Sequence, residues 1–501
     1  MRTRRMLGLK MGLLGMLALA GTGDRALSQG NYIEIDPYDS SVASLARGLK
    51  VRSDGRNHNI LLALRGLGDP ELRPLFQSMF SSNEPTLQID AVLALAELGE
   101  TSVDPFLLQQ MEEKQRSLAL MAAISLELYD EDLVKTMGEF PDLTEVEQTM
   151  LIIMGVKLGL EPDTGRLEGL LESEDRVTRM VAAVLNNDLT GRTDELEREI
   201  ERYRGLSVSE RILVSGALID IASWHPMPGA LAVLRAVAND PEMSRSLRLA
   251  AIDSALGCKC PDGIKLWIEA TRLANSSGDR SRLGVAAIER GIVSEDWSGI
   301  SDERQLNQRI AMAGRGLADE TQASEAVVEL MRIRHPLSIQ AALGVADNLQ
   351  DREAAERIWL MIMRSALTDV RLQPLMGRLY RNLSERGSEE LERVIWEISQ
   401  VEGQQLLKEI LLTAILESGS PRSVEYASLF KDERDRTIRS LVLLVKAKSD
   451  EPLDEQELEE LTLITTGGGR IDPTVRSIAG WLWLKRNDQV DKAMMEIMSD
   501  A

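Results

Sequence analysis

Histidine, cysteine and aromatic side chains are scarce in this chain of 501 residues, which has three His, two Cys, seven Trp, six Tyr and five Phe. So few imidazoles and thiols leave little material for a metal site built from His or Cys. The shortage of aromatic rings also argues against a long groove in which sugars stack. The sequence therefore identifies no catalytic residue, no cofactor-binding residue and no metal ligand.

Positive charge is also in short supply. The chain has 80 Asp and Glu against 58 Lys and Arg, which gives a formal net charge of −22. A nucleic-acid-binding protein needs basic residues to neutralise phosphates, so the acidic balance argues against nucleic acid as a partner. An anionic membrane surface attracts basic segments, so docking on such a surface is disfavoured. Hydrophobic residues make up 44% of the chain, enough to bury a sizeable core, which argues against wholesale disorder.

Long apolar runs are missing, and the longest candidate lies at the N-terminus. Residues 1–28 have the order of a secretory signal peptide: a basic start, an apolar run over 11–20, and small residues at Ala26 and Ser28. The run is about half the length of a membrane span. We predict cleavage after Ser28, with Ala20 as the alternative, and export to the periplasm or, as a second possibility, outside the cell. The basic residues are Arg2, Arg4, Arg5 and Lys10.

The export route stays open between two signals. Arg4 and Arg5 resemble the paired arginines of the twin-arginine signal, but Gly8 stands where that signal prefers a bulky apolar residue, and ordinary signals also contain paired arginines. Removal of residues 1–28 leaves 53 basic and 79 acidic residues and a net charge of −26. No later stretch is apolar enough to span a membrane, so we expect no membrane span in the mature chain.

An internal repeat determines the predicted fold. Residues 62–68 (LALRGLG) match 93–99 (LALAELG) at an offset of 31, and residues 437–441 match 474–478 at an offset of 37. Self-similarity at such a period indicates a stacked array in which each unit is a helix pair. The apolar residues of 85–98 follow a helical spacing, and no run alternates as a strand would. The fold is therefore predicted to be all-α.

The repeats resemble the HEAT repeat family of armadillo-type proteins. The resemblance rests on paired helices of 30–40 residues, on an acid-Pro turn, and on an Arg that precedes an Ala-rich face, as in residues 472–479 (DPTVRSIA). It implies a right-handed α-solenoid, a superhelix of stacked helix pairs with a surface that binds protein. It brings no catalytic residues with it.

The chain divides into five expected parts. Residues 1–28 form the signal peptide and 29–45 an N-terminal extension. Residues 46–275 form a HEAT-like array, 276–305 an irregular joint or long loop, and 306–501 a second HEAT-like array with a C-terminal cap. Because one helix pair cannot bury both of its faces, neighbours must stack and the two ends must be capped.

The inward stripe of the repeat gives a first expectation about stability. Leu95 lies on that stripe, where an unpaired charge costs several kcal/mol. Glu97 is expected at a solvent position. Leu95→Asp should therefore destabilise the protein far more than Glu97→Ala.

Cys258 and Cys260 are the only thiols, and they share the turn Gly257 to Gly263. An exposed pair could be redox-active or bind a metal. We favour a non-catalytic turn, either reduced or bridged, because a bridge across one residue is strained relative to usual Cα separations and no further ligands complete a zinc site.

The three His have no catalytic context. His225 and His335 each precede a proline in turns that end helices, so both are expected in solvent. His58 lies near the first repeat and has no visible partner.

Other polar segments are best explained as loops and solvated helix faces. The glycine loop 466–470 lacks the spacing of a phosphate-binding loop, and the acidic run 450–460 lacks the pattern of a calcium loop. In 194–204 we expect Leu196, Ile200 and Tyr203 to face inward while Asp194–Arg198 and Glu199–Arg202 pair outside. Trp481, Trp483, Met150 and Met154 are interpreted as core.

Two functions of different class remain. The first is a non-enzymatic scaffold that binds another protein or peptide, with a basic segment as one candidate partner, along the groove of its solenoid. The alternative is a periplasmic enzyme or enzyme-accessory subunit, in which carboxylate pairs such as Glu455 and Glu459 would do acid–base chemistry.

Overall fold

The computed structural model describes residues 36–48, 56–81, 84–99, 102–224, 227–274, 276–294, 296–302, 304–333, 335–449, 451–467 and 471–500. The predicted signal peptide lies outside the described residues. Within these ranges the chain forms helices α1 to α28 and short 3-10 turns, with no strand, which confirms the all-α prediction. These ranges also contain no helix that is both long and apolar enough to cross a lipid bilayer.

The chain forms two compact units, which we call the central unit and the terminal unit. The central unit contains residues 129–359, and the terminal unit combines residues up to Leu128 with residues from Leu360 onward. The boundary falls inside helix α20 (Arg352–Ser365).

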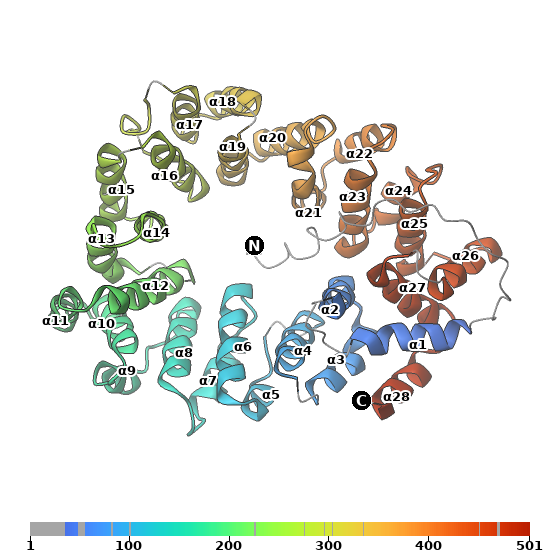
Figure 1. Cartoon of the computed structure of the whole chain (residues 1–501), viewed down its shortest axis with the longest axis horizontal. Helices are drawn as coiled ribbons and strands as arrows, with labels where there is room; N and C mark the ends of the chain where they lie inside the picture. Colours follow the sequence, from blue (N-terminus) through green and yellow to red (C-terminus); the bar gives the residue numbers. More distant parts are fainter. Residues whose placement is uncertain are drawn as a thin grey trace. The chain divides into compact units, whose positions relative to one another are not determined.

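The central unit is a stack of helix pairs. One helix of each pair, which we call an inner helix, contacts the inner helix of the next pair, in the order α8, α10, α12, α14, α16, α19 (Figure 1). Stacking of this kind is consistent with a solenoid; its handedness stays a prediction. The helices are α7 (Glu131–Gly138), α8 (Glu145–Leu158), α9 (Thr164–Leu171), α10 (Arg176–Thr190), α11 (Asp194–Arg204), α12 (Val208–Trp224), α13 (Leu231–Asn239), α14 (Arg245–Gly257), α15 (Pro261–Leu273), α16 (Ser277–Glu289), α17 (Gln305–Gly316), α18 (Glu320–Ile333) and α19 (Pro336–Asn348).

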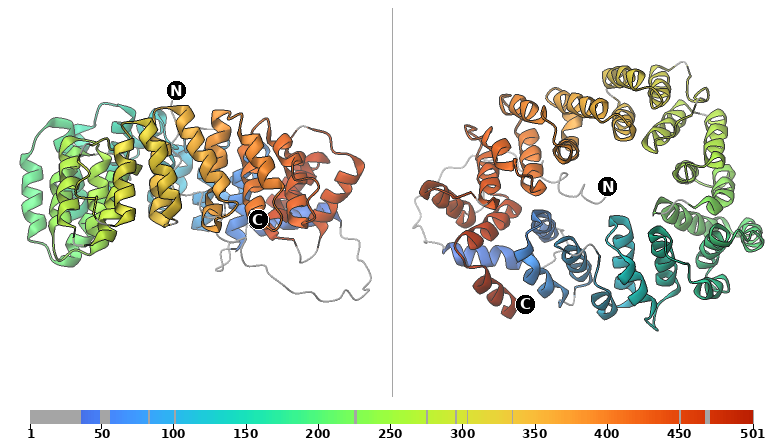
Figure 2. Two further views of the ribbon diagram at one scale, coloured as in Figure 1. Left: turned by 90° about the horizontal axis from the view of Figure 1, so that it is seen from above. Right: turned by 180° about the vertical axis from the view of Figure 1, so that it is seen from behind.

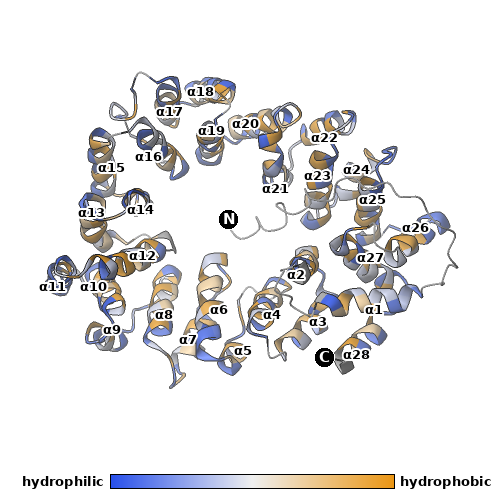
Figure 3. Ribbon diagram, in the orientation of Figure 1, coloured by the Kyte–Doolittle hydropathy of each residue, from blue (hydrophilic) through white to orange (hydrophobic). Residues whose placement is uncertain are grey.

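The terminal unit is built in the same way from both ends of the chain. Its neighbouring helices run side by side (Figure 2), and they carry both hydrophobic and hydrophilic residues (Figure 3). Its helices are α1 (Pro37–Gly48), α2 (Arg56–Leu67), α3 (Arg73–Phe80), α4 (Pro85–Glu97), α5 (Pro105–Gln110), α6 (Glu113–Leu126), α21 (Met376–Arg386), α22 (Leu391–Ser399), α23 (Gln405–Ser418), α24 (Ser423–Ser428), α25 (Arg436–Lys448), α26 (Glu455–Thr466), α27 (Pro473–Arg486) and α28 (Val490–Asp500).

The acid-Pro turns start helices, as their sequence indicates. Asp69, Asp104 and Asp472 each accept a hydrogen bond from the backbone N–H two residues later, and each is followed by a proline. The proline loses nothing there, because the first N–H groups of a helix have no partner within it.

The arginine of the repeat motif ties one helix pair to the next. Arg280 of α16 donates to the carbonyl oxygen of Ala274 at 2.8 Å and lies 3.3 Å from the Asp302 carboxylate. Arg211 of α12 lies 3.1 Å from Asp240, in the connection that follows the next helix. Both guanidinium groups thus bridge to a later segment, and that of Arg280 also satisfies a loop carbonyl. Arg179 of α10 and Arg476 of α27 also donate to the carbonyl of the preceding loop.

The segment 276–305, where we expected an irregular joint or long loop, begins with α16 (Ser277–Glu289). The irregularity lies after it, since both α17 and α18 precede the next inner helix, α19. Trp297 fills this joint: its ring lies edge-on to Trp267 at a centroid distance of 5.0 Å, and its Nε1 donates to Ser294. A Cβ atom on Gly314 would lie 2.1 Å from the Trp297 ring, so only glycine fits there.

The expected N-terminal extension, 29–45, contributes most of α1, which packs on α26, α27 and α28. Tyr38 donates to Glu496 at 2.9 Å, and Ser40 donates to the carbonyl oxygen of Thr465 at 2.8 Å. A Cβ on Gly480 would lie 3.1 Å from the backbone of Ser41, so α1 and α27 approach closely.

A buried carboxylate links the two ends of the chain within the terminal unit. Asp69 is 7% exposed and accepts hydrogen bonds from Trp481 Nε1 at 3.0 Å and from Lys485 Nζ at 2.9 Å. Burial raises the pKa of Asp69, but these bonds and the backbone N–H of Glu71 outweigh it, so the pKa is lowered. Trp481 is therefore core, as expected, and also a hydrogen-bond donor.

The expectation for Glu97 was wrong. Glu97 accepts two hydrogen bonds from Arg65, at 2.5 and 2.8 Å, and the two side chains are only 17% and 14% exposed. The repeat places these residues 32 positions apart on adjacent helices, α2 and α4. Leu95 is 6% exposed, so its place on the inward stripe is confirmed.

We predict that Gly314→Ala lowers the free energy of unfolding by about 1–3 kcal/mol, because the new methyl group overpacks the Trp297 ring. Gly169→Ala in α9 is the matched control, since nothing lies within 4 Å of a Cβ there. It should be neutral or stabilising by up to about 1 kcal/mol. Urea unfolding of both variants measures the difference, and equal midpoints would contradict the tight contact.

We also predict that Leu95→Asp destabilises by about 3 kcal/mol or more, because it buries an unpaired charge. Glu97→Ala should cost about 1–3 kcal/mol, since it leaves the Arg65 guanidinium half-buried without its acceptor. Chemical denaturation with the Arg65→Ala/Glu97→Ala double variant checks this. If the double variant loses the full sum of the two single losses, the residues are not coupled.

Candidate functional site

Five carboxylates mark one edge of the central unit. Each inner helix from α10 to α19 has an acidic residue within its last five positions, and none of these helices has a basic residue in its last turn. We call this set the acidic row. It consists of Asp188, Asp220, Asp253, Glu289 and Asp347.

Contacts between neighbouring helices place these carboxylates at the same level. Arg290, directly after α16, forms an ion pair with Asp253 of α14 at 2.9 Å. Asn348 of α19 donates to the carbonyl oxygen of Glu289 at 3.1 Å. The ends of α14, α16 and α19 therefore lie side by side.

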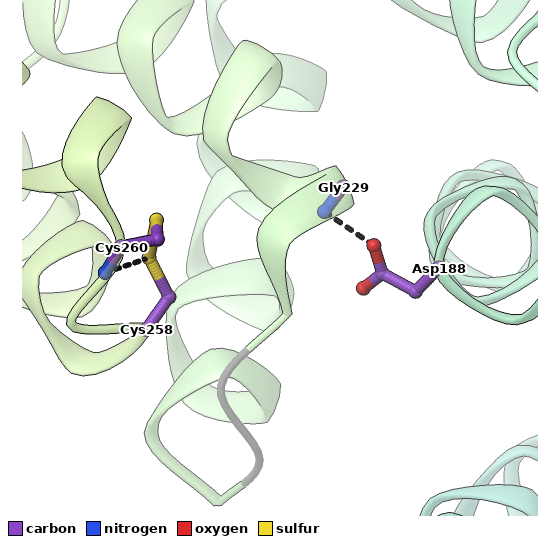
Figure 4. Close-up of a disulfide and its surroundings, with 4 residues drawn as sticks. All are labelled: Asp188, Gly229, Cys258 and Cys260. Atoms are coloured by element: carbon purple, nitrogen blue, oxygen red, sulfur yellow. Dashed lines mark hydrogen bonds between the residues drawn. A yellow bond between two sulfur atoms is a disulfide. The ribbon is translucent and has the colours of Figure 1, made fainter. Parts of the chain in front are cut away.

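The same level continues to α12 and α10. Ser254 of α14 donates to the carbonyl oxygen of Ile219, directly before Asp220. Asp188 of α10 accepts a hydrogen bond from the backbone N–H of Gly229, which follows α12, at 2.6 Å (Figure 4). The acidic row thus runs across five successive inner helices.

One carboxylate oxygen of Asp188 accepts a hydrogen bond, and within the described structure the other accepts none. Its Oδ2 atom is buried and has no hydrogen-bond partner among the described residues. Burial raises the pKa of Asp188, and the Gly229 hydrogen bond counters that rise only in part. A Cβ on Gly229 would lie 2.8 Å from the side chains of Asn187 and Asp188, so the approach requires glycine.

Helix α12, which bears Asp220, also has exposed apolar residues. Leu213, about two helical turns before Asp220, is 68% exposed, and its neighbour Ile212 is 44% exposed. Gly216 leaves open space between Leu213 and Asp220. The surrounding protein partly desolvates the Asp220 carboxylate and raises its pKa. This stretch of α12 therefore combines an apolar patch with a carboxylate.

Helix stability does not explain the acidic row. The C-terminal end of a helix is the negative end of its dipole, where a carboxylate is unfavourable by roughly 0.3–1 kcal/mol and a cation is favoured. In the terminal unit, α25 and α27 follow that rule with basic residues in their last turns, whereas α4, α6 and α23 have none there. Asp253 is paired with Arg290 and Asp188 is partly buried, so the exposed carboxylates Asp220, Glu289 and Asp347 contribute most of a negative potential suited to binding cations. The basic residues of α25 and α27 are Lys446, Lys448, Lys485 and Arg486.

The two cysteines form a disulfide, which our sequence interpretation had left open. The Cα atoms of Cys258 and Cys260 are 5.2 Å apart, within the usual range of about 4.4–6.8 Å, so the expected misfit was wrong. Lys259 has a φ of +51°, and this left-handed residue turns the chain enough to bring the two sulfurs together.

The histidines have structural partners where they are described. His58 lies 3.1 Å from the Asp90 carboxylate, contrary to our expectation of no partner, and this interaction raises the pKa of His58. His335 is exposed and caps α19 by accepting the backbone N–H of Leu337 through Nδ1. His225 lies outside the described residues.

The acidic run 450–460 starts a helix. Asp454 caps α26 together with Glu457, which also pairs with Lys446. Asp454, Glu455 and Glu459 line only a shallow depression. In the glycine loop 466–470, the last three residues lie outside the described residues.

Helix α11 agrees with its predicted stripe, with corrections to its ion pairs. Leu196 and Tyr203 are buried and Ile200 is partly buried. Arg198 pairs with Glu195 at 3.0 Å instead of Asp194, because residues three apart lie closer here. Glu199 pairs with Arg202 as expected, but it is buried and does not face solvent.

The remaining candidates are packing residues. Met150 and Met154 are buried, which confirms their place in the core. Trp483 is partly buried and donates to Thr462 at 3.0 Å.

The sequence analysis missed the acidic row, although a signal exists. Asp188, Asp220, Asp253 and Glu289 recur at spacings of 32, 33 and 36, the period of the repeat itself. An alignment of the repeats by the C-terminal ends of their helices, instead of by their N-terminal ends, would have shown this recurrence. Within the described residues, no three His, Cys, Asp or Glu side chains are grouped to hold a metal ion. No model of a known protein family matches the chain, and no curated protein has a similar sequence.

We predict that Asp220→Asn stabilises the protein at pH 7 by roughly 0.3–1 kcal/mol, since it removes a charge from a negative helix end. The folded-state pKa of Asp220 is raised, so its penalty exists above that pKa and disappears as the pH falls through it. The gain should vanish on acidification. Urea unfolding between pH 7 and pH 3 measures this.

Asp296→Asn is the matched control in the same unit. Hydrogen bonds from Ser298 lower the pKa of Asp296, so its contribution to stability is present above the unfolded pKa and is lost as the pH falls. This variant should be destabilised at pH 7. The same sign of change in both variants would contradict the assignment.

Proposed function

We propose that this protein is an exported, non-enzymatic scaffold, a HEAT-like right-handed α-solenoid that binds a basic segment of another protein or peptide along the acidic row. The observation that supports this is the presence of five carboxylates at negative helix ends, where they oppose helix stability. Asp188 and Asp253 have structural partners in Gly229 and Arg290, so the proposal rests mainly on the exposed members Asp220, Glu289 and Asp347. Residues that break a local rule are candidates for function.

The spacing of the row suits an extended polypeptide. Packed helices lie about 8–10 Å apart, so neighbouring carboxylates are separated by about that distance. An extended chain advances about 3.3 Å per residue. A basic residue at every third position would therefore meet one carboxylate after another. We infer a partner segment with Lys or Arg at that interval.

The electrostatics favour such a partner. The Debye length at physiological salt is about 8 Å, close to the separation of adjacent carboxylates. The electrostatic potentials of neighbouring carboxylates therefore overlap. The combined potential raises the local concentration of a cationic segment and speeds its association.

The apolar patch of α12 adds a second kind of contact. Ile212 and Leu213 are exposed on α12, about two helical turns before Asp220. An apolar side chain of the partner that covered them would add affinity independent of salt, at roughly 25 cal/mol per Å² of apolar surface buried. We expect the bound segment to contain an apolar residue between basic ones.

Export is part of the proposal and rests on residues 1–28. Their basic start, short apolar run and small residues at Ala26 and Ser28 are those of a secretory signal peptide. The place of action is then the periplasm, or the exterior of the cell.

The test is the binding of a fluorescent peptide with Lys at every third position and one central Leu. We predict at least a tenfold loss of affinity between 50 and 500 mM salt. A peptide of the same composition with its Lys clustered at one end should bind more weakly. A flat salt response would contradict the proposed binding mode.

Matched triple variants locate the site. Asp220→Asn/Glu289→Gln/Asp347→Asn should weaken peptide binding at least tenfold. The control, Asp194→Asn/Glu197→Gln/Glu201→Gln, changes the net charge equally on exposed residues of α11 and should leave binding nearly unchanged. Equal losses in both variants would show that only the total charge matters.

A further inference from the structure

The disulfide lies in an accessible turn at the edge of the acidic row. Cys258 follows the last residue of α14, and Cys260 directly precedes α15 (Figure 4). Both residues are partly exposed. The bond therefore joins two residues that the turn already holds near each other.

Such a bridge contributes little to holding the fold together. A disulfide stabilises mainly by closing a loop in the unfolded chain, and the effect is smallest for the shortest loops. The turn is also closed by backbone hydrogen bonds, from Lys259 to Leu256 at 3.0 Å and from Ile264 to Cys260 at 3.1 Å. A structural staple is thus a poor explanation for the only two cysteines of the chain.

The two sulfurs differ in their surroundings. Cys258 Sγ accepts the backbone N–H of Cys260 at 3.3 Å (Figure 4). A Cβ on Gly263 would lie 3.2 Å from Cys258 Sγ and 2.4 Å from the carbonyl oxygen of Ala255, so this glycine lets the sulfur lie against the first turn of α15. The N-terminal end of a helix stabilises a thiolate. Cys258 caps the negative end of α14 and Cys260 is the N-cap of α15, so the helix dipoles alone do not rank the two sulfurs. The backbone N–H of Cys260 that Cys258 Sγ accepts favours Cys258 as the leaving group.

We propose that the Cys258–Cys260 disulfide is redox-active and oxidises pairs of cysteine thiols in a polypeptide. A thiolate of the polypeptide attacks Cys260 Sγ, forms a mixed disulfide and expels the Cys258 thiolate. The second cysteine thiolate of the polypeptide then attacks the polypeptide sulfur that is bonded to Cys260. This step closes the new disulfide in the polypeptide and releases the Cys260 thiolate. Two electrons and two protons pass to the protein, whose disulfide becomes a dithiol while the polypeptide gains a disulfide.

The position of the disulfide beside the acidic row also determines which polypeptides can reach it. This substrate preference rests on the proposed function. Asp253, in the last five residues of α14, belongs to the acidic row, and Asp220 of the neighbouring α12 lies at the same level. A basic segment bound along the row would carry its cysteines past the turn. The substrate class is therefore a cationic polypeptide with two nearby cysteines.

The test uses the oxidised full chain and two synthetic dithiol peptides, one with Lys and one with Glu around the same two cysteines. Mass spectrometry after acid quenching follows both disulfides. We expect oxidation of one peptide per protein with loss of the protein disulfide, at least tenfold faster for the Lys peptide at 50 mM salt. No transfer to either peptide within hours would overturn the proposal.

The two hypotheses fail separately. Transfer at equal rates to both peptides supports the redox activity and contradicts the basic partner. Binding of the Lys peptide without transfer contradicts the redox activity alone. The Cys258→Ser/Cys260→Ser variant should keep its melting temperature within a few degrees and lose all transfer, whereas transfer that persists in it would overturn the assignment.

Single variants test which sulfur is attacked. In the Cys258→Ser variant, Cys260 is the remaining thiol and forms a mixed disulfide with a small probe, oxidised 5-thio-2-nitrobenzoate. In the Cys260→Ser variant, Cys258 is the remaining thiol, and its ionisation can be measured by itself. Reaction with iodoacetamide should show Cys258 ionising at lower pH than an ordinary thiol, whose midpoint is about 8.5. A midpoint at or above that value would contradict its role as leaving group.

Discussion

No helix pair of this chain can bury both of its faces by itself, so each inner helix must pack against the next. Close approach is possible because small residues lie at the contacts. In α19, Ala341, Ala342 and Gly344 are buried, and a Cβ on Gly344 would lie 3.1 Å from the backbone of Glu289. Stability in such a stack is the sum of nearest-neighbour contacts, so the loss of one contact is felt by two pairs.

This packing leaves few places for function. The sides of an inner helix are used for stacking, so the free surface is reduced to the helix ends and the exposed stripe. Residues one repeat apart in the sequence meet at the ends, which is why Asp220 and Asp253 lie at one level. A site built this way is a line of similar groups, one from each repeat. It suits an extended ligand better than a small molecule held from all sides.

Local features were predictable from the sequence, and contacts between repeats were not. The caps Asp104 and Asp472, and the burial of Leu95, depend on residues within a few positions of each other. The Arg65–Glu97 pair joins residues 32 apart, and the His58–Asp90 pair does the same. Their detection requires the register of one helix against the next, which hydrophobic periodicity does not give. The acidic row went unnoticed for the same reason.

The terminal unit contains contacts that the repeat period does not predict. Asp69 and Trp481 are 412 residues apart, yet they share a buried hydrogen bond. In the central unit, by contrast, the ties between helix pairs join residues about 20–60 apart, as in Arg211–Asp240, Arg290–Asp253 and Asn348–Glu289. Loop closure costs entropy that grows with the separation, and contacts between distant residues form slowly. The central unit can therefore fold from local contacts as soon as its repeats exist. Helix α1, although made early, packs mainly against α2 among its early neighbours and cannot form most of its packing until α26, α27 and α28 have been made.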